Sequence, residues 1–259
     1  MKGRYIIEIL NRNKIFAFDI DDTIAVNGTV LEGVNALFKY IKSKNHHIVL
    51  VTKRTQLESL LILDQLETEV DLISFGGKLI TDTTQMKLWA CHEVLDIRTL
   101  SHLREKEIVV LQGPDGWSVA DNRMLPLAKM ILGLPLHMKR RWDENFPVYR
   151  VIVRGRLEQE SCYQIFGDLI KVSYWTSLPL TEIRTRSENK AIGLNAYSAI
   201  VNSSDILAVG DDFPDISMFG LANDSITFIT SPVEVRAAAS IVANHFTDIA
   251  EYIHGLIGK

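Results

Sequence analysis

The sequence has few of the features that mark secreted, metal-thiolate or membrane-spanning chains. It contains only two cysteines, Cys91 and Cys162, and they are too far apart for a metal-type pairing. Its longest run without Asp, Glu, Lys or Arg is the 14 residues 191–204, which is shorter than the roughly 18 apolar residues of a membrane-spanning helix. Arg12 and Lys14 follow the N-terminal apolar stretch before the core of a signal peptide could form. We therefore expect a cytoplasmic chain with reduced thiols.

The sequence also lacks an excess of basic charge. Lys and Arg total 28 against 32 Asp and Glu, the formal net charge is -4, and the basic residues are scattered. This distribution gives no electrostatic footprint for nucleic acid, so a small anionic substrate would need a local positive site. A hydrophobic content of 47% with 23% charged residues is typical of a globular chain, and 259 residues allow one large or two modest domains.

Apolar runs with the length and spacing of strands and helices alternate at both ends of the chain, which favours a parallel, Rossmann-like α/β sheet. We expect strands at 15–18, 47–52, 72–75, 206–210, 226–229 and 241–243. Helical apolar spacing follows at 34–41, 57–66 and 194–201. No internal repeat or low-complexity segment interrupts this pattern. The two ends, 1–84 and 187–259, are therefore predicted to form one domain.

The middle of the chain, residues 85–186, has a different character and is predicted to be an inserted α+β domain. Pro114-Asp115-Gly116 is a hairpin signal, and strand-like runs occupy 108–111 and 148–153. We expect helices at 93–105 and 157–169.

An acidic turn follows the first predicted strand: Phe18-Asp19-Ile20-Asp21-Asp22-Thr23. Open α/β sheets place their sites at the carboxyl ends of strands, and clustered carboxylates there favour a hard cation such as magnesium. A solvated acidic turn explains this segment alone equally well. A calcium loop does not, because its sixth and twelfth positions would need Gly and Glu, and Ile24 and Val30 occupy them.

A second acidic turn, Gly210-Asp211-Asp212-Phe213-Pro214-Asp215, follows the predicted strand 206–210. Both turns can converge at one edge of the sheet. Taken by itself, the second turn also fits a helix start with Pro in the first turn and acids facing the helix dipole.

Two further polar residues lie at related positions: Thr52 ends the predicted strand 47–52, and Lys190 precedes a predicted helix. Taken singly, a threonine or a lysine at such a position is most often a surface or capping residue. The order of the four features along the chain, an acid pair, a hydroxyl, a lysine and another acid pair, favours a single site.

In this order, Asp19, Asp21, Thr23, Thr52, Lys190, Asp211 and Asp215 resemble the four motifs of the haloacid dehalogenase superfamily. The resemblance extends nearly end to end and looks like the Cof-type branch with a type IIB cap. Three segments differ from that branch: Thr52-Lys53-Arg54 replaces Thr-Gly-Arg, Gly76-Gly77-Lys78 replaces Asn-Gly-Ala, and Pro214 replaces an Asn. The second acidic turn also looks somewhat like that of trehalose-6-phosphate phosphatases.

The resemblance implies a magnesium-dependent phosphatase that hydrolyses a small phosphomonoester, a sugar phosphate in our interpretation, through an aspartyl phosphate. It implies Asp19 as nucleophile and Asp21 as general acid and base. Thr52 and Lys190 would contact the phosphoryl group, and Arg54 would join them in binding the substrate. Mg²⁺ would be held by Asp19, Asp211 and the backbone carbonyl of Asp21. Asp215 would orient Lys190 or a metal-bound water, and Asp212 would assist there or only cap the helix.

The inserted domain would close over the core and contact the leaving group. Arg140, Arg141, Arg150 and Arg154 are its candidate contacts, although solvated surface arginines are the alternative for each. A phosphomutase or phosphotransferase would use the same aspartyl phosphate without water as acceptor. A non-catalytic phosphometabolite-binding protein is the alternative of a different class. The sequence leaves the oligomeric state and the individual substrate open.

Overall fold

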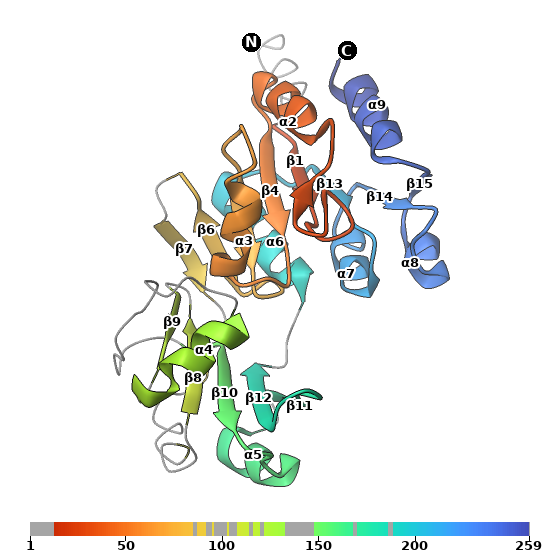
Figure 1. Cartoon of the computed structure of the whole chain (residues 1–259). Helices are drawn as coiled ribbons and strands as arrows, with labels where there is room; N and C mark the ends of the chain where they lie inside the picture. The colour runs from red at the N-terminus through yellow and green to blue at the C-terminus, as the bar shows by residue number, and fades with distance from the viewer. Residues whose placement is uncertain are drawn as a thin grey trace. The chain divides into compact units, whose positions relative to one another are not determined.

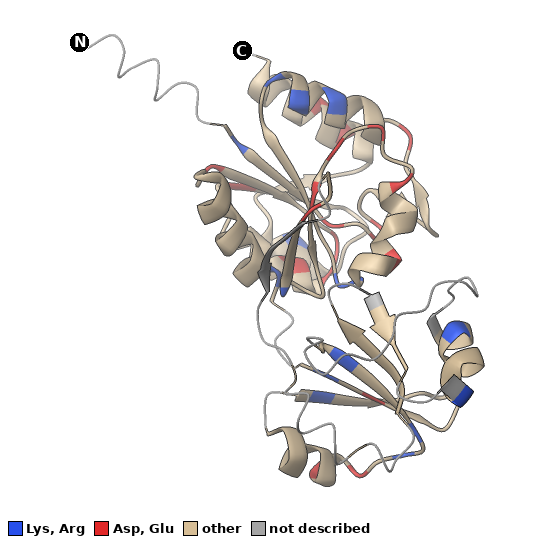
Figure 2. Cartoon of the chain, turned by 90° about the vertical axis from the view of Figure 1, so that its left-hand side faces the viewer, with Lys and Arg blue, Asp and Glu red and all other residues tan. Residues whose placement is uncertain are grey.

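The computed structural model describes residues 13–84, 87–91, 95, 103, 108–113, 116–119, 122–132, 148–167, 170–185 and 189–258 (Figure 1). The chain forms two compact units, Met1–Ala90 with Glu188–Lys259, and Cys91–Ser187. The inserted-domain limits that the sequence predicts, 85 and 186, remain a proposal. Lys and Arg are spread over both units (Figure 2). Within the described ranges, no helix is long and apolar enough to cross a membrane.

The first unit is built on an eight-stranded sheet of order β15-β14-β13-β1-β4-β5-β6-β7. Its strands are β1 (Ile15–Phe18), β4 (His47–Val51), β5 (Asp71–Ser74), β6 (Leu79–Asp82), β7 (Lys87–Cys91), β13 (Ile206–Val209), β14 (Asp224–Phe228) and β15 (Ile241–Ala243). The pairs from β15 to β5 are parallel, and β6 is antiparallel to β5. This order confirms the predicted α/β class.

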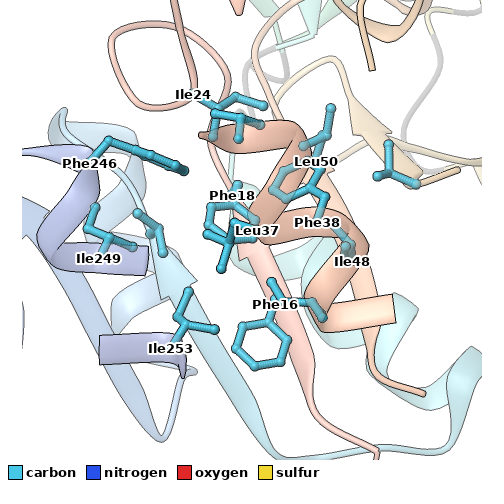
Figure 3. Packing of buried hydrophobic residues seen from close by; sticks show 14 of the residues in the cluster. Phe16, Phe18, Ile24, Leu37, Phe38, Ile48, Leu50, Phe246, Ile249 and Ile253 are labelled. Carbon is cyan, nitrogen blue, oxygen red and sulfur yellow. The ribbon is translucent and has the colours of Figure 1, made fainter. Parts of the chain in front are cut away.

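The central strand β1 is buried on both faces, as a strand inside a parallel sheet must be. Phe16 and Phe18 pack on one face with α2 (Val34–Ser43) and α9 (Phe246–Ile257), as Figure 3 shows. Ile15 and Ala17 face the other side, where they belong to the cluster formed with α6 (Lys190–Val201). The strict alternation fixes the direction in which residue 19 leaves the strand.

A short hairpin that the sequence analysis did not anticipate follows the first acidic turn. It pairs β2 (Ala25–Val26) with β3 (Thr29–Val30). Asn27 and Gly28 form its turn with φ of 51° and 78°. Asn-Gly is the sequence that best tolerates positive φ at both positions of such a turn, so the signal was present in the sequence.

Three short helices of the first unit each follow the end of a strand or the turn after it. They are α3 (Gln56–Leu63), α7 (Ile216–Phe219) and α8 (Val233–Ala238). Thr55 and Glu58 form a capping box at the start of α3, in which each side chain accepts a hydrogen bond from the other's backbone N–H. This cap fixes the loop between β4 and α3.

The second unit contains a five-stranded antiparallel sheet of order β11-β12-β10-β8-β9. Its elements are β8 (Ile108–Gly113), β9 (Gly116–Ser118), α4 (Leu125–Leu132), β10 (Arg150–Arg154), α5 (Gln159–Phe166), β11 (Ile170–Tyr174) and β12 (Leu180–Thr185). The predicted hairpin between β8 and β9 is confirmed by the pairing of Gly113 with Gly116. The predicted helix 157–169 is shorter than expected, since Gly167 ends it with a φ of 73°. Most of the predicted helix 93–105 lies outside the described residues.

Candidate active site

The site forms where the parallel strands β4, β1 and β13 end side by side. Phe18 is in register with Leu50 on β4 and with Val209 on β13. The next residue of β1 is Asp19, whose backbone N–H donates to the carbonyl of Val209 over 2.9 Å. The predicted convergence of residues 19, 52 and 211 at one edge of the sheet follows from this register.

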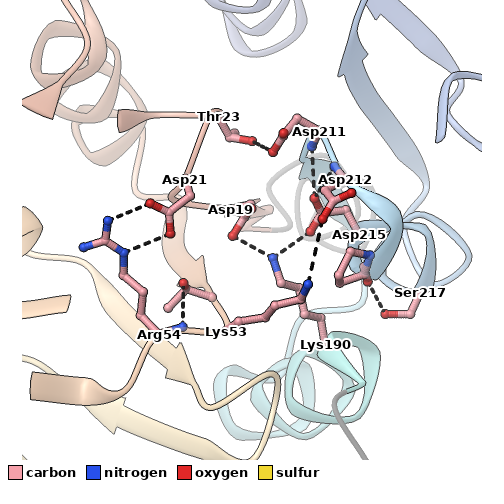
Figure 4. A network of polar contacts seen from close by, with 12 residues as sticks. Asp19, Asp21, Thr23, Lys53, Arg54, Lys190, Asp211, Asp212, Asp215 and Ser217 are labelled. Atoms are coloured by element: carbon pink, nitrogen blue, oxygen red, sulfur yellow. Dashed lines mark hydrogen bonds and ion pairs between the residues drawn. The ribbon is translucent and has the colours of Figure 1, made fainter. Parts of the chain in front are cut away.

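A buried cation lies between two acids at the centre of the site (Figure 4). The Lys190 Nζ atom lies 2.6 Å from Asp19 Oδ1 and 2.7 Å from Asp215 Oδ1. The three residues are 2%, 7% and 0% exposed, respectively. The attraction of both carboxylates outweighs burial, which alone would lower the pKa of Lys190, so that the pKa is raised above its ordinary value. Lys190 is therefore a fixed positive charge beside Asp19.

The second oxygen of Asp215 organises the acidic turn after β13. Oδ2 accepts hydrogen bonds from the backbone N–H groups of Asp211 and Asp212, at 2.9 and 3.0 Å. A Cβ atom at position 210 would lie 2.4 Å from the Asp215 Cγ atom, so only glycine fits there. Asp215 thus joins the lysine to the turn that carries Asp211.

Asp211 points back toward the first acidic turn. Its Oδ1 atom accepts a hydrogen bond of 2.9 Å from the Thr23 hydroxyl. Burial raises the pKa of Asp211 to about 6, although this hydrogen bond opposes the shift. Burial likewise raises the pKa of Asp19 to about 7, against the opposing attraction of Lys190. The single ammonium group of Lys190 therefore does not offset the unfavourable burial of negative charge on these carboxylates.

This excess of buried acid fits a divalent cation. Carboxylate oxygens of Asp19, Asp211 and Asp215 lie within 4.8 Å of one another. Both oxygens of Asp215 already accept hydrogen bonds, so Asp19 and Asp211 are the better side-chain ligands. Hard carboxylate oxygens are the ligands that Mg²⁺ prefers. The backbone carbonyl of Asp21, the third predicted ligand, remains a prediction.

The loop after β4 carries Thr52, Lys53 and Arg54. Thr52 is 1% exposed, and its hydroxyl accepts a hydrogen bond of 3.1 Å from the backbone N–H of Arg54. The Arg54 guanidinium binds both carboxylate oxygens of Asp21. Lys53 lies 3.8 Å from Asp212, and both of these side chains are about half exposed. Contacts thus join the predicted site residues in two groups that lie where β1, β4 and β13 end: Asp19, Lys190, Asp211, Asp212 and Asp215, and Asp21, Thr52 and Arg54.

Two contributors were missing from the predicted site residues. Thr23 was recognised as part of the motif but was assigned no role, and it holds Asp211. Gly77 has a φ of 104°, and a Cβ atom there would lie 2.3 Å from the carbonyl oxygen of Asn189. Its packing therefore sets the start of α6 and the position of Lys190. The Gly76-Gly77 pair was the available signal.

The predicted contacts in the inserted segment have mixed outcomes. Arg140 and Arg141 lie outside the described residues. Arg150 Nε lies 2.8 Å from Glu182 Oε1, and Arg150 Nη1 donates to Gln112 over 3.1 Å. Arg154 is exposed. Arg150 thus contacts two residues of its own sheet.

The comparisons with known proteins agree with this geometry. The family described as haloacid dehalogenase-like hydrolase matches residues 16–123 and 137–253. A haloacid dehalogenase-like hydrolase from Bacteroides thetaiotaomicron has 16% sequence identity and a TM-score of 0.71, over 93% of this chain and all (100%) of that one. A Thermotoga maritima protein has 16% identity and a TM-score of 0.70, over 89% and 91% of the two chains.

A haloacid dehalogenase subclass IIB sugar phosphatase has 17% identity and a TM-score of 0.60, over 95% of this chain and 100% of that one. No curated protein matches the sequence. At these identities the solved structures show the fold, a parallel core sheet with a separate antiparallel sheet as in the type IIB members. The family match covers most of the chain, and the chain belongs to the haloacid dehalogenase-like hydrolases.

Proposed function

We propose that the chain is a Mg²⁺-dependent phosphatase that hydrolyses a small phosphomonoester, a sugar phosphate, through an aspartyl phosphate on Asp19. The buried Asp19–Lys190–Asp215 arrangement carries this proposal. A phosphate ester brings negative charge toward a carboxylate nucleophile, and a fixed ammonium group 2.6 Å from that nucleophile reduces the repulsion. The sugar phosphatase of similar fold supports the substrate class.

In the first step, an Asp19 oxygen forms a bond to phosphorus while the bond from phosphorus to the leaving oxygen breaks. Asp21 gives a proton to the leaving oxygen, which departs as an alcohol. In the second step, Asp21 takes a proton from a water molecule, whose oxygen attacks phosphorus. The bond from phosphorus to Asp19 then breaks and releases inorganic phosphate.

The other residues act on the charge and orientation of the phosphoryl group. Lys190 stabilises negative charge on the phosphoryl oxygens and on Asp19, and the Thr52 hydroxyl donates a hydrogen bond to a phosphoryl oxygen. Asp19 and Asp211 would hold Mg²⁺, which would supply positive charge against the two anions that must approach each other. Asp215 holds Lys190 and the Asp211 turn in place.

The inserted segment, predicted as residues 85–186, supplies the leaving-group contacts in this proposal, with exposed Arg154 as its described candidate. The proposed partner is a phosphorylated metabolite of the cytoplasm.

A panel of phosphomonoesters tests the proposal. Sugar phosphates, phosphorylated three-carbon acids, nucleoside monophosphates and p-nitrophenyl phosphate are incubated with the protein and Mg²⁺, and released phosphate is measured. We expect turnover of a sugar phosphate, and less than about a tenth of that rate for Asp19→Asn, whose amide is no nucleophile. Turnover of no ester in the panel, or a fully active Asp19→Asn variant, would refute the proposal. Addition of free sugars separates hydrolysis from transfer to a second alcohol.

A further inference from the structure

The Arg54 side chain lies against the carboxylate of Asp21 in a two-point contact (Figure 4). Nε donates to Oδ2 over 2.9 Å, and Nη2 donates to Oδ1 over 2.6 Å. This fork-to-fork geometry fixes the plane of a carboxylate as well as its position. The same contact accounts for the direction of the Arg54 pKa, which the hydrogen bond to Asp21 raises.

Arg54 is itself held by contacts outside the acidic turn. Its Nη1 donates to the carbonyl of Glu58 over 3.1 Å, and its own carbonyl accepts from the backbone N–H of Phe75 over 2.8 Å. Glu58 belongs to the capping box of α3. The guanidinium is therefore tied to a helix start and to the loop after β5, and its side chain is 22% exposed.

Asp21 has the opposite character. Its side chain is 53% exposed and lies in a tight turn, where the next residue, Asp22, has a φ of 55°. A half-exposed carboxylate on a turn samples several rotamers unless a partner fixes it. Within the described part of the chain, the Asp21 carboxylate accepts its side-chain hydrogen bonds from Arg54. The orientation of the Asp21 carboxylate thus depends on its contact with Arg54.

We infer that Arg54 is a positioning residue, which acts on the reaction by aiming the carboxylate of Asp21 and not by binding the phosphoryl group. The inference rests on the proposed function, in which Asp21 transfers protons to and from oxygen. Each carboxylate oxygen has two lone pairs, and Arg54 occupies one on each. The remaining lone pairs are available to exchange a proton with the leaving oxygen and the attacking water. A bidentate contact of Arg54 with phosphate would require the Asp21 contact to break.

Lys53 provides a matched control on the same loop. It carries the same charge and is adjacent in sequence, but its Nζ lies 3.8 Å from Asp212, and its side chain is 47% exposed. Exposed pairs at such distances contribute little. Lys53→Met therefore removes one positive charge from the loop without touching Asp21.

A double-mutant cycle of Arg54→Met and Asp21→Asn tests the inference. Single-turnover rates are measured for a sugar phosphate, whose alkoxide needs a proton, and for p-nitrophenyl phosphate, whose leaving group does not. We expect Arg54→Met to slow the sugar phosphate by about 10- to 100-fold and the aryl phosphate far less, since a misplaced acid loses about this much. The double variant should be no slower than Asp21→Asn, because the two residues act as one unit. Lys53→Met should leave this ratio unchanged.

Binding of inorganic phosphate, measured by calorimetry in the presence of Mg²⁺, gives a readout that does not depend on turnover. We expect Arg54→Met to bind phosphate like the wild type. Weakened phosphate binding, equal rate losses for both esters and additive effects in the cycle would instead show that Arg54 binds the phosphoryl group.

Two further outcomes are distinguishable. A wild-type protein that binds phosphate but hydrolyses no ester refutes the proposed function, and the inference with it. If Arg54→Met does not fold, Arg54→Lys replaces it in the cycle, because lysine keeps the charge but cannot form the two-point contact. An Arg54→Lys variant with the full wild-type rate on the sugar phosphate would overturn the inference.

Discussion

The carboxylate of Asp215 binds the ammonium group of Lys190 through one oxygen and the turn that carries Asp211 through the other. Asp215 is fully buried, and Lys190 is 2% exposed. One side chain therefore sets the position of the positive charge beside Asp19 and the position of Asp211, a proposed metal ligand. This dual contact explains why an acid four residues after Asp211 belongs to the site without facing the substrate.

Replacing Asp215 by Asn should destabilise the first unit and reduce turnover. An amide offers one acceptor oxygen, so either Lys190 or the backbone N–H groups would face its NH₂ group. We expect a loss of about 2–4 kcal/mol in the free energy of unfolding, which is typical when a buried charge loses its partner. Urea denaturation measures this loss. Asp205→Asn is the control, because its pair with Lys14 is partly exposed and should contribute less than about 1 kcal/mol. Equal midpoints for Asp215→Asn and the wild type would contradict the argument.

Metal binding should depend on Asp211 and not on its neighbour Asp212. Asp211 faces Asp19 in the acidic cluster, whereas the Asp212 side chain is 52% exposed. We expect Mg²⁺ to raise the melting temperature of the wild type and of Asp212→Asn, but not that of Asp211→Asn.

Chelator should abolish turnover, and Ca²⁺ should inhibit because its longer bonds and larger coordination number disturb in-line attack. Full activity in chelator would remove the metal from the mechanism.

Gly77→Ala should impair the site without direct contact with substrate. The added Cβ would lie 2.3 Å from the carbonyl oxygen of Asn189, and the start of α6 must shift to relieve this clash. Lys190 begins that helix, so we expect a large loss of turnover in a folded protein. Gly28→Ala is the control, since Gly28 has a positive φ of 78° but nothing within 4 Å of an added Cβ. It should cost only about 1 kcal/mol of stability and no activity. Similar turnover in the two variants would argue against a steric role for Gly77.

The sequence predicted the parts of the site that follow from strand ends. The run Ile15–Phe18 is apolar throughout, so it had to be a buried strand, and the acids after it had to lie at its carboxyl end. The same argument placed Asp211. Thr52 was predicted as the last residue of a strand, but β4 ends at Val51, and the hydroxyl instead caps the loop that carries Arg54.

The contact between Asp21 and Arg54 could not be predicted in this way. It joins two loops 33 positions apart and depends on a long side chain, whose direction no periodicity encodes. Two other features also escaped the pattern. Gly167 ends α5 early, and β6 turns back antiparallel to β5 through residues with positive φ at 75–77. Local turn geometry decided each of these.

Arg150 and Arg154 should separate stability from specificity in the second unit. Arg150 is bound to Glu182 and Gln112, so Arg150→Met should leave a nearly buried carboxylate without its main partner. We expect it to lower the unfolding free energy by about 1–3 kcal/mol. Because Arg154 is exposed, Arg154→Met should cost less stability than Arg150→Met. It should alter the preference among sugar phosphates more than the turnover of p-nitrophenyl phosphate. Thermal melting and the substrate panel measure both effects. An unchanged preference order would place specificity in other residues.

A half-buried acid at the start of β5, Asp71, gives a last prediction that is independent of the proposed function. The Tyr197 hydroxyl donates to Asp71 Oδ2 over 2.6 Å, and Tyr197 is fully buried. Burial raises the pKa of Asp71 above its ordinary value of 3.8, although the hydrogen bond opposes this. At pH values between 3.8, the ordinary pKa, and the raised pKa of Asp71 in the folded protein, the folded protein binds more protons than the unfolded chain. Asp71 therefore lowers the free energy of unfolding progressively as the pH rises through that window.

Asp71→Asn should therefore gain stability relative to the wild type as the pH rises above about 4, because asparagine cannot ionise and its oxygen still accepts from Tyr197. Asp248→Asn should change in the opposite direction. Hydrogen bonds from the backbone N–H groups of Asn244 and His245 lower the pKa of Asp248, so its carboxylate stabilises the fold at neutral pH and loses that effect as the pH falls. Urea denaturation at several pH values, in chelator, measures both differences. Parallel pH profiles for the two variants would show that burial of Asp71 does not control its ionisation.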